Sequence, residues 1–290
     1  MKIDGRTKLV AIFGDPVEHT LSPAIHNPAF DSLGLNLVYA PFHVRPVDLK
    51  AAVSSIRALG FAGANITIPH KEKVMRFLDD LDHHAREAGA VNTIVNKKGR
   101  LIGYNTDGIG YLLSLREDTG FAVRGKKVII LGAGGASRAI FYAILDAKPG
   151  SVVISNRTPK RAEDLAREFG KKFKKTVIWT VPFEKSFLSE EARDADLLIN
   201  TTSLGMMSQG RLDFPVDHLP EGSVVSDIVY RPLDTELLKR ARKRGLKTHD
   251  GLSMLVRQGS IGFELWTGKK APVEAMKKAA LKALGPGKAR

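Results

Sequence analysis

The spacing of hydrophobic residues predicts strands and helices that alternate along the chain. In the first half, short apolar segments predict strands and amphipathic segments predict helices. The predicted strands span residues 8–13, 37–42, 63–68, 91–95 and 101–104, and the predicted helices span residues 22–33, 47–58, 71–77 and 108–117. We find no internal repeat, so this half predicts a mixed α/β domain.

The second half has a regular strand–helix–strand pattern. The predicted strands span residues 128–131, 151–155, 176–181, 196–200, 224–229 and 246–249, with helices at 136–147 and 235–244. Right-handed connections between such strands give a doubly wound parallel sheet. Helices predicted at 254–268 and 272–284 follow the completed sheet, so we expect them to return to the first domain.

A glycine-rich turn joins the first strand and helix of this series. Val128-Ile-Ile-Leu131 precedes Gly132, Gly134 and Gly135, and the helical pattern begins at Ala136. This context favours a dinucleotide-binding turn, in which backbone N–H groups at the helix N-terminus meet a pyrophosphate. Ser137 occupies the third position of the glycine pattern, where a small residue still permits close packing of helix and strand.

The next strand ends in a basic loop. Enzymes selective for NAD usually carry an acidic residue there for the ribose 2′-hydroxyl. Here the loop is Asn156-Arg157-Thr158-Pro159-Lys160-Arg161, with three cations and no carboxylate. Cations attract a 2′-phosphate, so the loop predicts NADP rather than NAD as the cofactor.

These patterns predict two domains. Residues 1–107, completed by C-terminal helices within 252–290, form a mixed α/β substrate-binding and catalytic domain. Residues 108–251 form a Rossmann-type domain with a doubly wound parallel sheet, which binds NADP.

Composition narrows the function classes. The 290 residues carry a formal net charge of +14 and contain no cysteine, which excludes a thiol nucleophile and a Cys-based metal site. No zinc-finger spacing or aromatic RNA-binding strand accompanies the charge, so we expect anionic small molecules rather than nucleic acid as partners. No apolar run is long enough to span a membrane, and residues 1–9 lack the apolar core of a secretory signal. We therefore expect a cytoplasmic protein, monomeric or homodimeric, with no metal.

Polar residues gather in the first half where turns meet predicted elements. Thr20 and Ser22 enter a helix, with Ser22 as the expected N-cap, and their hydroxyls suit a carboxylate. Asn65 and Thr67 share one face of a strand, and Lys71 follows at the expected start of a helix. Further polar candidates are Asn92-Thr93 and Asn105-Thr106-Asp107.

Together these segments resemble the shikimate dehydrogenase family, NADP-dependent enzymes of aromatic amino-acid biosynthesis. The resemblance covers nearly the whole chain. It is carried by the motifs Gly14–Pro16, His19–Pro23, His26-Asn27, Asn65–Lys71, Gly89–Thr93, Gly103–Gly108, Gly132–Ala136, Asn156–Thr158, Asn200–Met206, Asp227–Pro232, Asp250-Gly251 and Gln258.

The resemblance implies a function for each motif. Lys71 and Asp107 match the catalytic pair of a reversible reduction of 3-dehydroshikimate to shikimate by NADPH. The implied substrate-binding residues are Thr20, Ser22, Asn65, Thr67, Asn92, Tyr230 and Gln258. The implied NADP-binding residues are Gly132, Ala133, Gly134, Gly135, Ala136, Asn156, Arg157, Thr158, Lys160, Arg161, Thr201, Ser203, Ile228 and Gly251. The family usually has Ser at the position of Thr20, which keeps the hydroxyl and adds a methyl group.

Three alternatives stay open at this stage. The nearest is a quinate/shikimate dehydrogenase that uses NAD or NADP. A nucleotide-sensing or nucleic-acid-binding protein on a Rossmann scaffold would need no Lys71–Asp107 pair. A methylene-tetrahydrofolate-type dehydrogenase also combines a Lys with this fold, but the Thr20–Ser22 and Asp107 clusters suit a small polyhydroxy acid better.

Overall fold

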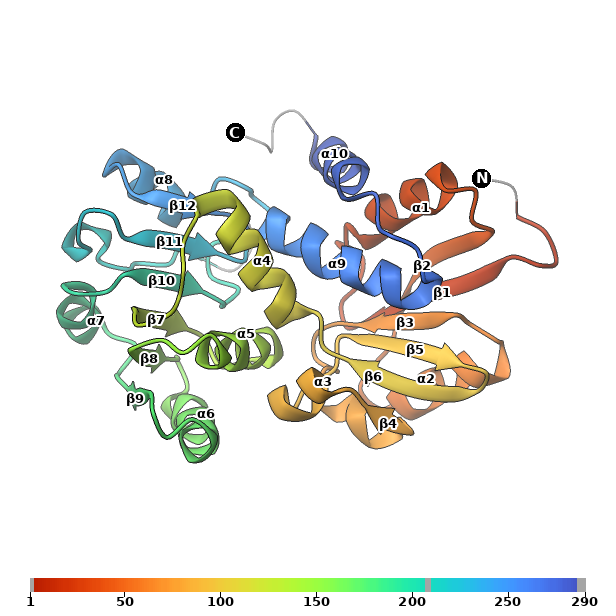
Figure 1. The fold of residues 1–290 in the computed structure, drawn as a ribbon, viewed down its shortest axis with the longest axis horizontal. Coiled ribbons are helices and arrows are strands. Elements are labelled where there is room, and N and C mark those ends of the chain that lie inside the picture. The colour runs from red at the N-terminus through yellow and green to blue at the C-terminus, as the bar shows by residue number, and fades with distance from the viewer. Residues whose placement is uncertain (1–2, 207–209, 286–290) are drawn as a thin grey trace. The chain divides into compact units, whose positions relative to one another are not determined.

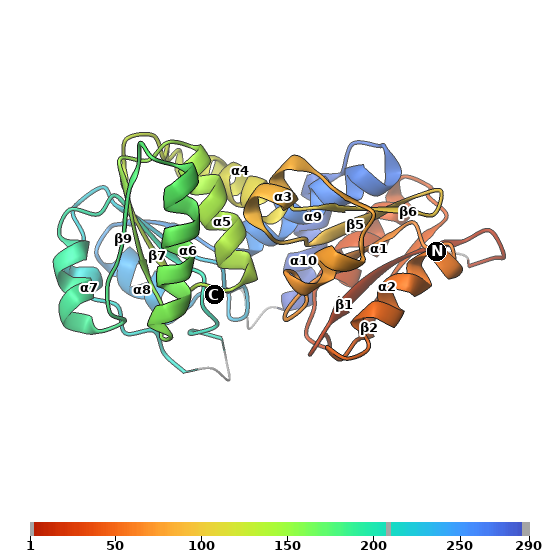
Figure 2. The same ribbon diagram turned by 90° about the horizontal axis from the view of Figure 1, so that it is seen from below.

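The structure is a computed structural model that describes residues 3–206 and 210–285. The chain folds into two compact units (Figure 1, Figure 2). The first unit contains the chain up to Gly110 together with Val256–Ala283, and the second contains Tyr111–Leu255. The units divide at residues 110/111 and 255/256, whereas the sequence pattern placed the domain boundaries at 107/108 and 251/252.

The first unit is built on a mixed six-stranded sheet. Its elements are β1 (Lys8–Gly14), α1 (Ser22–Ser32), β2 (Leu37–His43), α2 (Leu49–Ala58), β3 (Gly63–Ile66), the 3₁₀ helix η1 (Lys73–Phe77), β4 (Asp80–Leu81), α3 (His83–Ala88), β5 (Thr93–Lys97), β6 (Arg100–Tyr104) and α10 (Val273–Leu284). The strand order is β2-β1-β3-β5-β6-β4. Strand β1 pairs parallel to β2 and β3, whereas β5 pairs antiparallel to β3 and β6.

Helices cover this sheet because its strands carry buried side chains on both faces. Phe13 and Ile66 pack with Ile56 of α2 in one apolar cluster. In a second cluster, Phe30 of α1 stacks on Phe263 of α9 (Gly251–Thr267), with ring centroids 5.2 Å apart. Helix α9 therefore belongs to the core of the first unit over most of its length, as the sequence pattern predicted for this segment.

The second unit is a parallel six-stranded sheet. Its elements are β7 (Lys127–Leu131), α5 (Gly135–Asp146), β8 (Ser151–Ser155), α6 (Pro159–Lys172), β9 (Val177–Thr180), α7 (Lys185–Ala192), β10 (Leu197–Asn200), η2 (Val216–His218), β11 (Val224–Asp227), α8 (Glu236–Lys243) and β12 (Lys247–His249), and α4 (Asp107–Thr119) leads into it. The strand order is β12-β11-β10-β7-β8-β9, with every neighbouring pair parallel. The order reverses between β7 and β10, which is where such sheets bind their ligands.

Both faces of the parallel sheet are buried. Ile129 and Leu131 of β7 pack in a cluster with Leu188 of α7 and Leu238 of α8. Alternate residues of a strand point to opposite faces, and the intervening Val128 and Ile130 are also fully buried. Helices α5 and α6 lie side by side (Figure 2), with the rings of Phe141 and Phe169 in edge contact at 5.4 Å. The predicted doubly wound fold is confirmed.

Two features of the fold differ from the sequence prediction. The helix expected at residues 71–77 is the 3₁₀ helix Lys73–Phe77, and Lys71 lies in the turn before it. A segment this short gains too few hydrogen bonds to offset the nucleation of an α-helix. The short helix α3 and the charged helices α6 and α7 were not predicted. In α6 only three side chains are buried, so its hydrophobic pattern in the sequence is weak. None of the described helices is long and apolar enough to cross a membrane.

The backbone at Gly132 requires glycine. Its φ is +112°, and a Cβ atom there would lie 2.4 Å from Oγ1 of Thr201. We expect Gly132→Ala to lower the free energy of unfolding by about 1–3 kcal/mol. Gly170→Ala is the matched control, because Gly170 lies in α6 with no atom within 4 Å of an added Cβ. That change should raise stability by up to about 1 kcal/mol. Urea unfolding measures both, and equal effects would contradict the assignment.

Candidate active site

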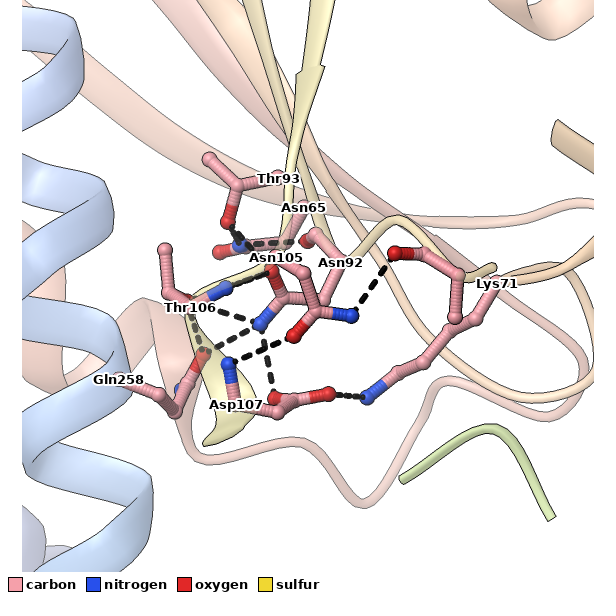
Figure 3. Close-up of polar contacts among 9 residues, drawn as sticks. Asn65, Lys71, Asn92, Thr93, Asn105, Thr106, Asp107 and Gln258 are labelled. Carbon is pink, nitrogen blue, oxygen red and sulfur yellow. Dashed lines mark hydrogen bonds and ion pairs between the residues drawn. The ribbon is translucent and has the colours of Figure 1, made fainter. Parts of the chain in front are cut away.

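A largely buried ion pair lies at the centre of the polar cluster in the first unit (Figure 3). Lys71 Nζ is 2.5 Å from Asp107 Oδ2, although the two residues are 36 positions apart in the sequence. Their side chains are only 12% and 5% exposed. Lys71 lies in the turn after β3, and the N–H of Val91 donates to its carbonyl oxygen at 2.8 Å. The sequence pattern placed Lys71 at a helix N-terminus, and that expectation is wrong.

Asn92 holds the second oxygen of the carboxylate. Its amide nitrogen lies 2.8 Å from Asp107 Oδ1, 2.9 Å from Thr106 Oγ1 and 3.2 Å from Gln258 Oε1. Its amide oxygen accepts the backbone N–H of Thr106 at 2.8 Å. The orientation of the Asn92 amide is therefore fixed at both ends, and Asp107 has a partner on each oxygen (Figure 3).

This arrangement satisfies the electrostatic demands of buried charges. Removing one member of a buried ion pair leaves an uncompensated charge, which is strongly destabilising. Asp107 is also the first residue of α4, where the helix dipole favours a carboxylate. The cluster holds an ammonium group at a fixed position with little exposure to solvent. Such a group can stabilise negative charge on a substrate oxygen and deliver a proton to it.

The remaining predicted substrate residues of the first unit differ in their surroundings. Thr20 Oγ1 lies 3.2 Å from the hydroxyl oxygen of Ser22. Ser22 is the first residue of α1 and not its N-cap, which is Leu21 without a side-chain bond. Thr67 is half-buried at the end of β3. Asn65 is buried, and its amide nitrogen lies 3.0 Å from the carbonyl oxygen of Asn92 and 3.1 Å from Thr93 Oγ1.

The second unit forms the predicted glycine turn after β7. The N–H of Gly132 donates to the carbonyl oxygen of Ser155 at 2.8 Å, which ties the turn to β8. The hydroxyl of the buried Ser137 donates to the carbonyl oxygen of Gly132 at 2.6 Å. The N-cap of α5 is Gly134, which has no side chain to bond the first N–H groups of the helix. Those N–H groups, from Gly135 and Ala136 onward, can donate hydrogen bonds to an anion.

Other predicted cofactor residues follow the C-terminal ends of the neighbouring strands β10, β11 and β12. Thr201 lies against Gly132 and donates its hydroxyl to the carbonyl oxygen of Leu131 at 2.6 Å. A Cβ on Gly251 would lie 2.1 Å from the carbonyl oxygen of Ile228, so these two residues are in close contact. Ser203 lies in the turn after β10. Ala133 lies within the glycine turn itself.

The basic loop opens helix α6. Asn156 donates to the carbonyl oxygen of Thr158 at 2.9 Å, and Thr158 is the N-cap without a side-chain bond. Lys160 forms an exposed ion pair with Asp164 at 2.8 Å, and Arg157 and Arg161 are exposed. The first turn of α6 contains no acidic residue. Cations at a helix N-terminus oppose the helix dipole, so their clustering here is more consistent with an anion ligand than with helix stability.

Tyr230 belongs to the second unit, unlike the other predicted substrate residues. It is half-buried after β11, and burial raises the pKa of its hydroxyl.

Sequence reasoning missed a buried carboxylate at the end of β11. Asp227 Oδ1 accepts the side-chain amide of Asn200 at 2.9 Å and the N–H of Val229 at 3.1 Å, and Oδ2 accepts the hydroxyl of Thr235 at 2.8 Å. Burial raises the pKa of Asp227 to about 6, and the three hydrogen bonds oppose this shift. These bonds fix the strand ends that carry Thr201 and Ile228. The sequence signals were an Asp at the end of an apolar strand and its place in the motif Asp227–Pro232, although no role had been assigned to Asp227 itself.

The protein class follows from the sheet order, the glycine turn and the basic loop, which together define a dinucleotide-binding α/β protein. Residues 12–94 match the "Shikimate dehydrogenase substrate binding domain", residues 115–206 match "Shikimate / quinate 5-dehydrogenase", and residues 251–281 match "Shikimate 5'-dehydrogenase C-terminal domain". The chain belongs to the shikimate dehydrogenase family, which confirms the resemblance seen in the sequence.

Known proteins similar to the chain agree with this assignment. The "Shikimate dehydrogenase (NADP(+))" of Moorella thermoacetica is 47% identical over 287 residues, which cover 98% of this chain and 96% of that protein. A crystal structure of a shikimate dehydrogenase with NADP⁺ has a TM-score of 0.89 at 40% identity and covers 97% of both chains. The Thermus thermophilus enzyme, in complex with NADP(H) and shikimate, has a TM-score of 0.85 at 39% identity and covers 96% of this chain and all (100%) of its own.

The raised pKa of Asp227 predicts a pH-dependent stability. The folded protein retains this proton up to about pH 6, whereas an unfolded Asp releases it near 3.8. Protonation of Asp227 therefore contributes about 3 kcal/mol to the free energy of unfolding below pH 3.8. This contribution is lost as the pH rises through 6. Asp227→Asn should lack this term. Urea unfolding of both proteins from about pH 4 to about pH 8 tests the difference, and parallel pH curves would contradict it.

Proposed function

We propose that this protein catalyses the reversible reduction of 3-dehydroshikimate to shikimate with NADPH. The observation that carries the proposal is the buried Lys71–Asp107 pair, held by Asn92, in a chain of the shikimate dehydrogenase family. Its relatives include enzymes named for NADP⁺ and structures with shikimate and NADP(H).

The second unit has a donor set that fits NADP. The side-chain-free N-cap Gly134 leaves the first N–H groups of α5 for a pyrophosphate. In the basic loop, Arg157, Lys160 and Arg161 would hold the 2′-phosphate, with Asn156 and Thr158 beside it. Thr201, Ser203, Ile228 and Gly251 would complete the cofactor site. When bound, NADPH supplies the hydride for the carbonyl carbon.

The residues of the first unit supply the proton and the orientation. As the carbonyl group is reduced, its oxygen gains negative charge, which the ammonium of Lys71 stabilises. Lys71 then donates a proton to that oxygen, and in the reverse direction it accepts the proton from the hydroxyl. Asp107 keeps the ammonium in place and hydrogen-bonds a neighbouring substrate hydroxyl. Asn92, Gln258, Asn65 and Thr67 would bind the hydroxyls of the acid.

The hydroxyls of Thr20 and Ser22 would bind the carboxylate, and Tyr230 is the substrate-binding residue that the family resemblance implies in the second unit. This end of the pocket decides between shikimate and quinate, because quinate carries an extra hydroxyl on the carbon that bears the carboxylate. The family description names both acids. We therefore keep a quinate/shikimate dehydrogenase as the second candidate function. We expect small molecules to be the only partners of the protein. We also expect it to be a monomer or a homodimer.

An absorbance assay at the NADPH band tests the proposal. Wild-type protein with shikimate and NADP⁺ should produce NADPH, and kcat/KM should be higher for shikimate than for quinate and higher with NADP⁺ than with NAD⁺. Absence of turnover with every pair would overturn the proposed function, and a preference for quinate would favour the second candidate.

Lys71→Ala should lower kcat by about 10²–10⁴, the range for the loss of one general acid–base group. The affinity for NADPH should change little, since Lys71 lies in the first unit and away from the glycine turn in sequence. Lys73→Ala is the control, because Lys73 is an exposed lysine two positions later. Near-wild-type turnover of the Lys71 variant would show that its assigned role is wrong.

Arg157→Ala should raise KM for NADP⁺ by about 10- to 150-fold, because a charge-assisted bond to phosphate contributes about 1.5–3 kcal/mol. The KM for NAD⁺, which lacks the 2′-phosphate, should stay the same. Arg167→Ala removes an exposed arginine from α6 that pairs with Asp164, so it should leave both values unchanged. An equal rise for both cofactors in the Arg157 variant would contradict its role in selectivity.

A further inference from the structure

We propose that the hydroxyl of Tyr39 is a positioning group of the active site, which holds the side-chain amide of Asn65 in place within the hydrogen-bond chain that leads to Asn92. The inference rests on the proposed function, because it concerns how the acid substrate is bound. Tyr39 lies on β2 and is 2% exposed. Neither the sequence pattern nor the family resemblance assigned it a role.

The hydrogen bonds of the cluster form one directed chain that begins at Tyr39. Tyr39 Oη donates to Asn65 Oδ1 at 2.6 Å, and Asn65 Nδ2 donates to Thr93 Oγ1 at 3.1 Å. The Thr93 hydroxyl then donates to Asn92 Oδ1 at 3.1 Å. Asn92 Nδ2 donates to Asp107 Oδ1 at 2.8 Å. Each donor points toward the carboxylate, so the bonds polarise one another in the same direction.

The hydrogen bonds around Asn65 together determine which way its side-chain amide faces. The carbonyl oxygen of Asn92 can only accept, so the nitrogen of the Asn65 amide must face it, at 3.0 Å. The amide oxygen then needs a donor, because Asn65 is only 6% exposed and water has little access. Tyr39 is the donor that meets this need in the described structure.

The ring and backbone of Tyr39 are held so that the hydroxyl has one position. The ring stacks on His26, with centroids 4.6 Å apart and planes 10° apart. Asn27 clamps the backbone, accepting the N–H of Tyr39 at 2.7 Å and donating to its carbonyl oxygen at 3.0 Å. Burial lowers the pKa of His26 to about 3, so this stacking partner stays neutral. The His26-Asn27 motif thus fixes Tyr39.

The hydroxyl of Tyr39 also keeps its proton. Burial raises the pKa of Tyr39 well above its usual range, and a hydrogen bond with Ser22 opposes the shift. Tyr39 therefore remains a donor throughout the physiological pH range. Loss of the hydroxyl should loosen the side-chain amide of Asn65, which leads to Asp107 through Thr93 and Asn92.

Tyr39→Phe tests this role, because it removes one oxygen atom and keeps the stacked ring. We expect kcat/KM for shikimate to fall about 5- to 50-fold, mainly through a higher KM. The dissociation constant of shikimate, measured by titration calorimetry, should rise by a similar factor. The KM for NADP⁺ should not change. Tyr111→Phe is the matched control, since Tyr111 is a fully buried tyrosine of the second unit, and it should leave KM for shikimate unchanged.

A double-mutant cycle identifies the route of the effect. If Tyr39 acts through Asn65, adding Tyr39→Phe to Asn65→Ala should change kcat/KM less than about twofold. An unchanged KM for shikimate in Tyr39→Phe overturns the inference. So does an undiminished effect in the Asn65→Ala background, or an equal rise in KM for NADP⁺. Wild-type protein that neither binds nor oxidises shikimate would instead overturn the proposed function.

Discussion

The buried ion pair between Lys71 and Asp107 is the interaction on which the organisation of the first unit depends. Two charges with side chains only 12% and 5% exposed can coexist there because each oxygen of the carboxylate has a donor. Burial of a charge without such partners costs several kcal/mol. The surrounding amides, Asn92 foremost, therefore serve stability and chemistry together. They compensate the carboxylate, and by doing so they fix the ammonium where a substrate oxygen must approach.

In the second unit, the main structural feature is a set of backbone N–H donors that is available to bind a ligand. The glycine turn has Gly134 in place of a side-chain cap, so the first N–H groups of α5 stay available for an anion. Ser137 and Thr201 hold the backbone on either side of Gly132 with bonds of 2.6 Å to carbonyl oxygens. Asp227 ties the ends of β10 and β11 in the same way. The neighbouring side chains thus hold the backbone of the turn in place, and the first N–H groups of α5 remain available to bind an anion.

Much of the fold could be predicted from local pattern. Runs such as Val128–Leu131 are short, apolar and rich in β-branched residues, and they are followed by a glycine turn, which together favour a buried strand. Prediction was weaker where tertiary contacts replace local preference. Helix α6 buries only Ala162, Leu165 and Phe169, so its apolar face is narrow. The turn at Lys71 departs from a helix because the N–H of Val91, far along the chain, bonds to its carbonyl oxygen.

The sequence by itself determined most of the strands and helices, the glycine turn, the basic loop and the residue types of the site, because each depends on neighbours within a few positions. Only the tertiary structure decided which of these residues meet. Asn92 and Gln258 are 166 positions apart, and Tyr39 and Asn65 are 26 apart, yet both pairs share hydrogen bonds. Strand register and helix packing bring such residues together, and neither can be predicted from the spacing of residues along the chain. The roles we infer for Tyr39 and Asp227 therefore came from the structure alone.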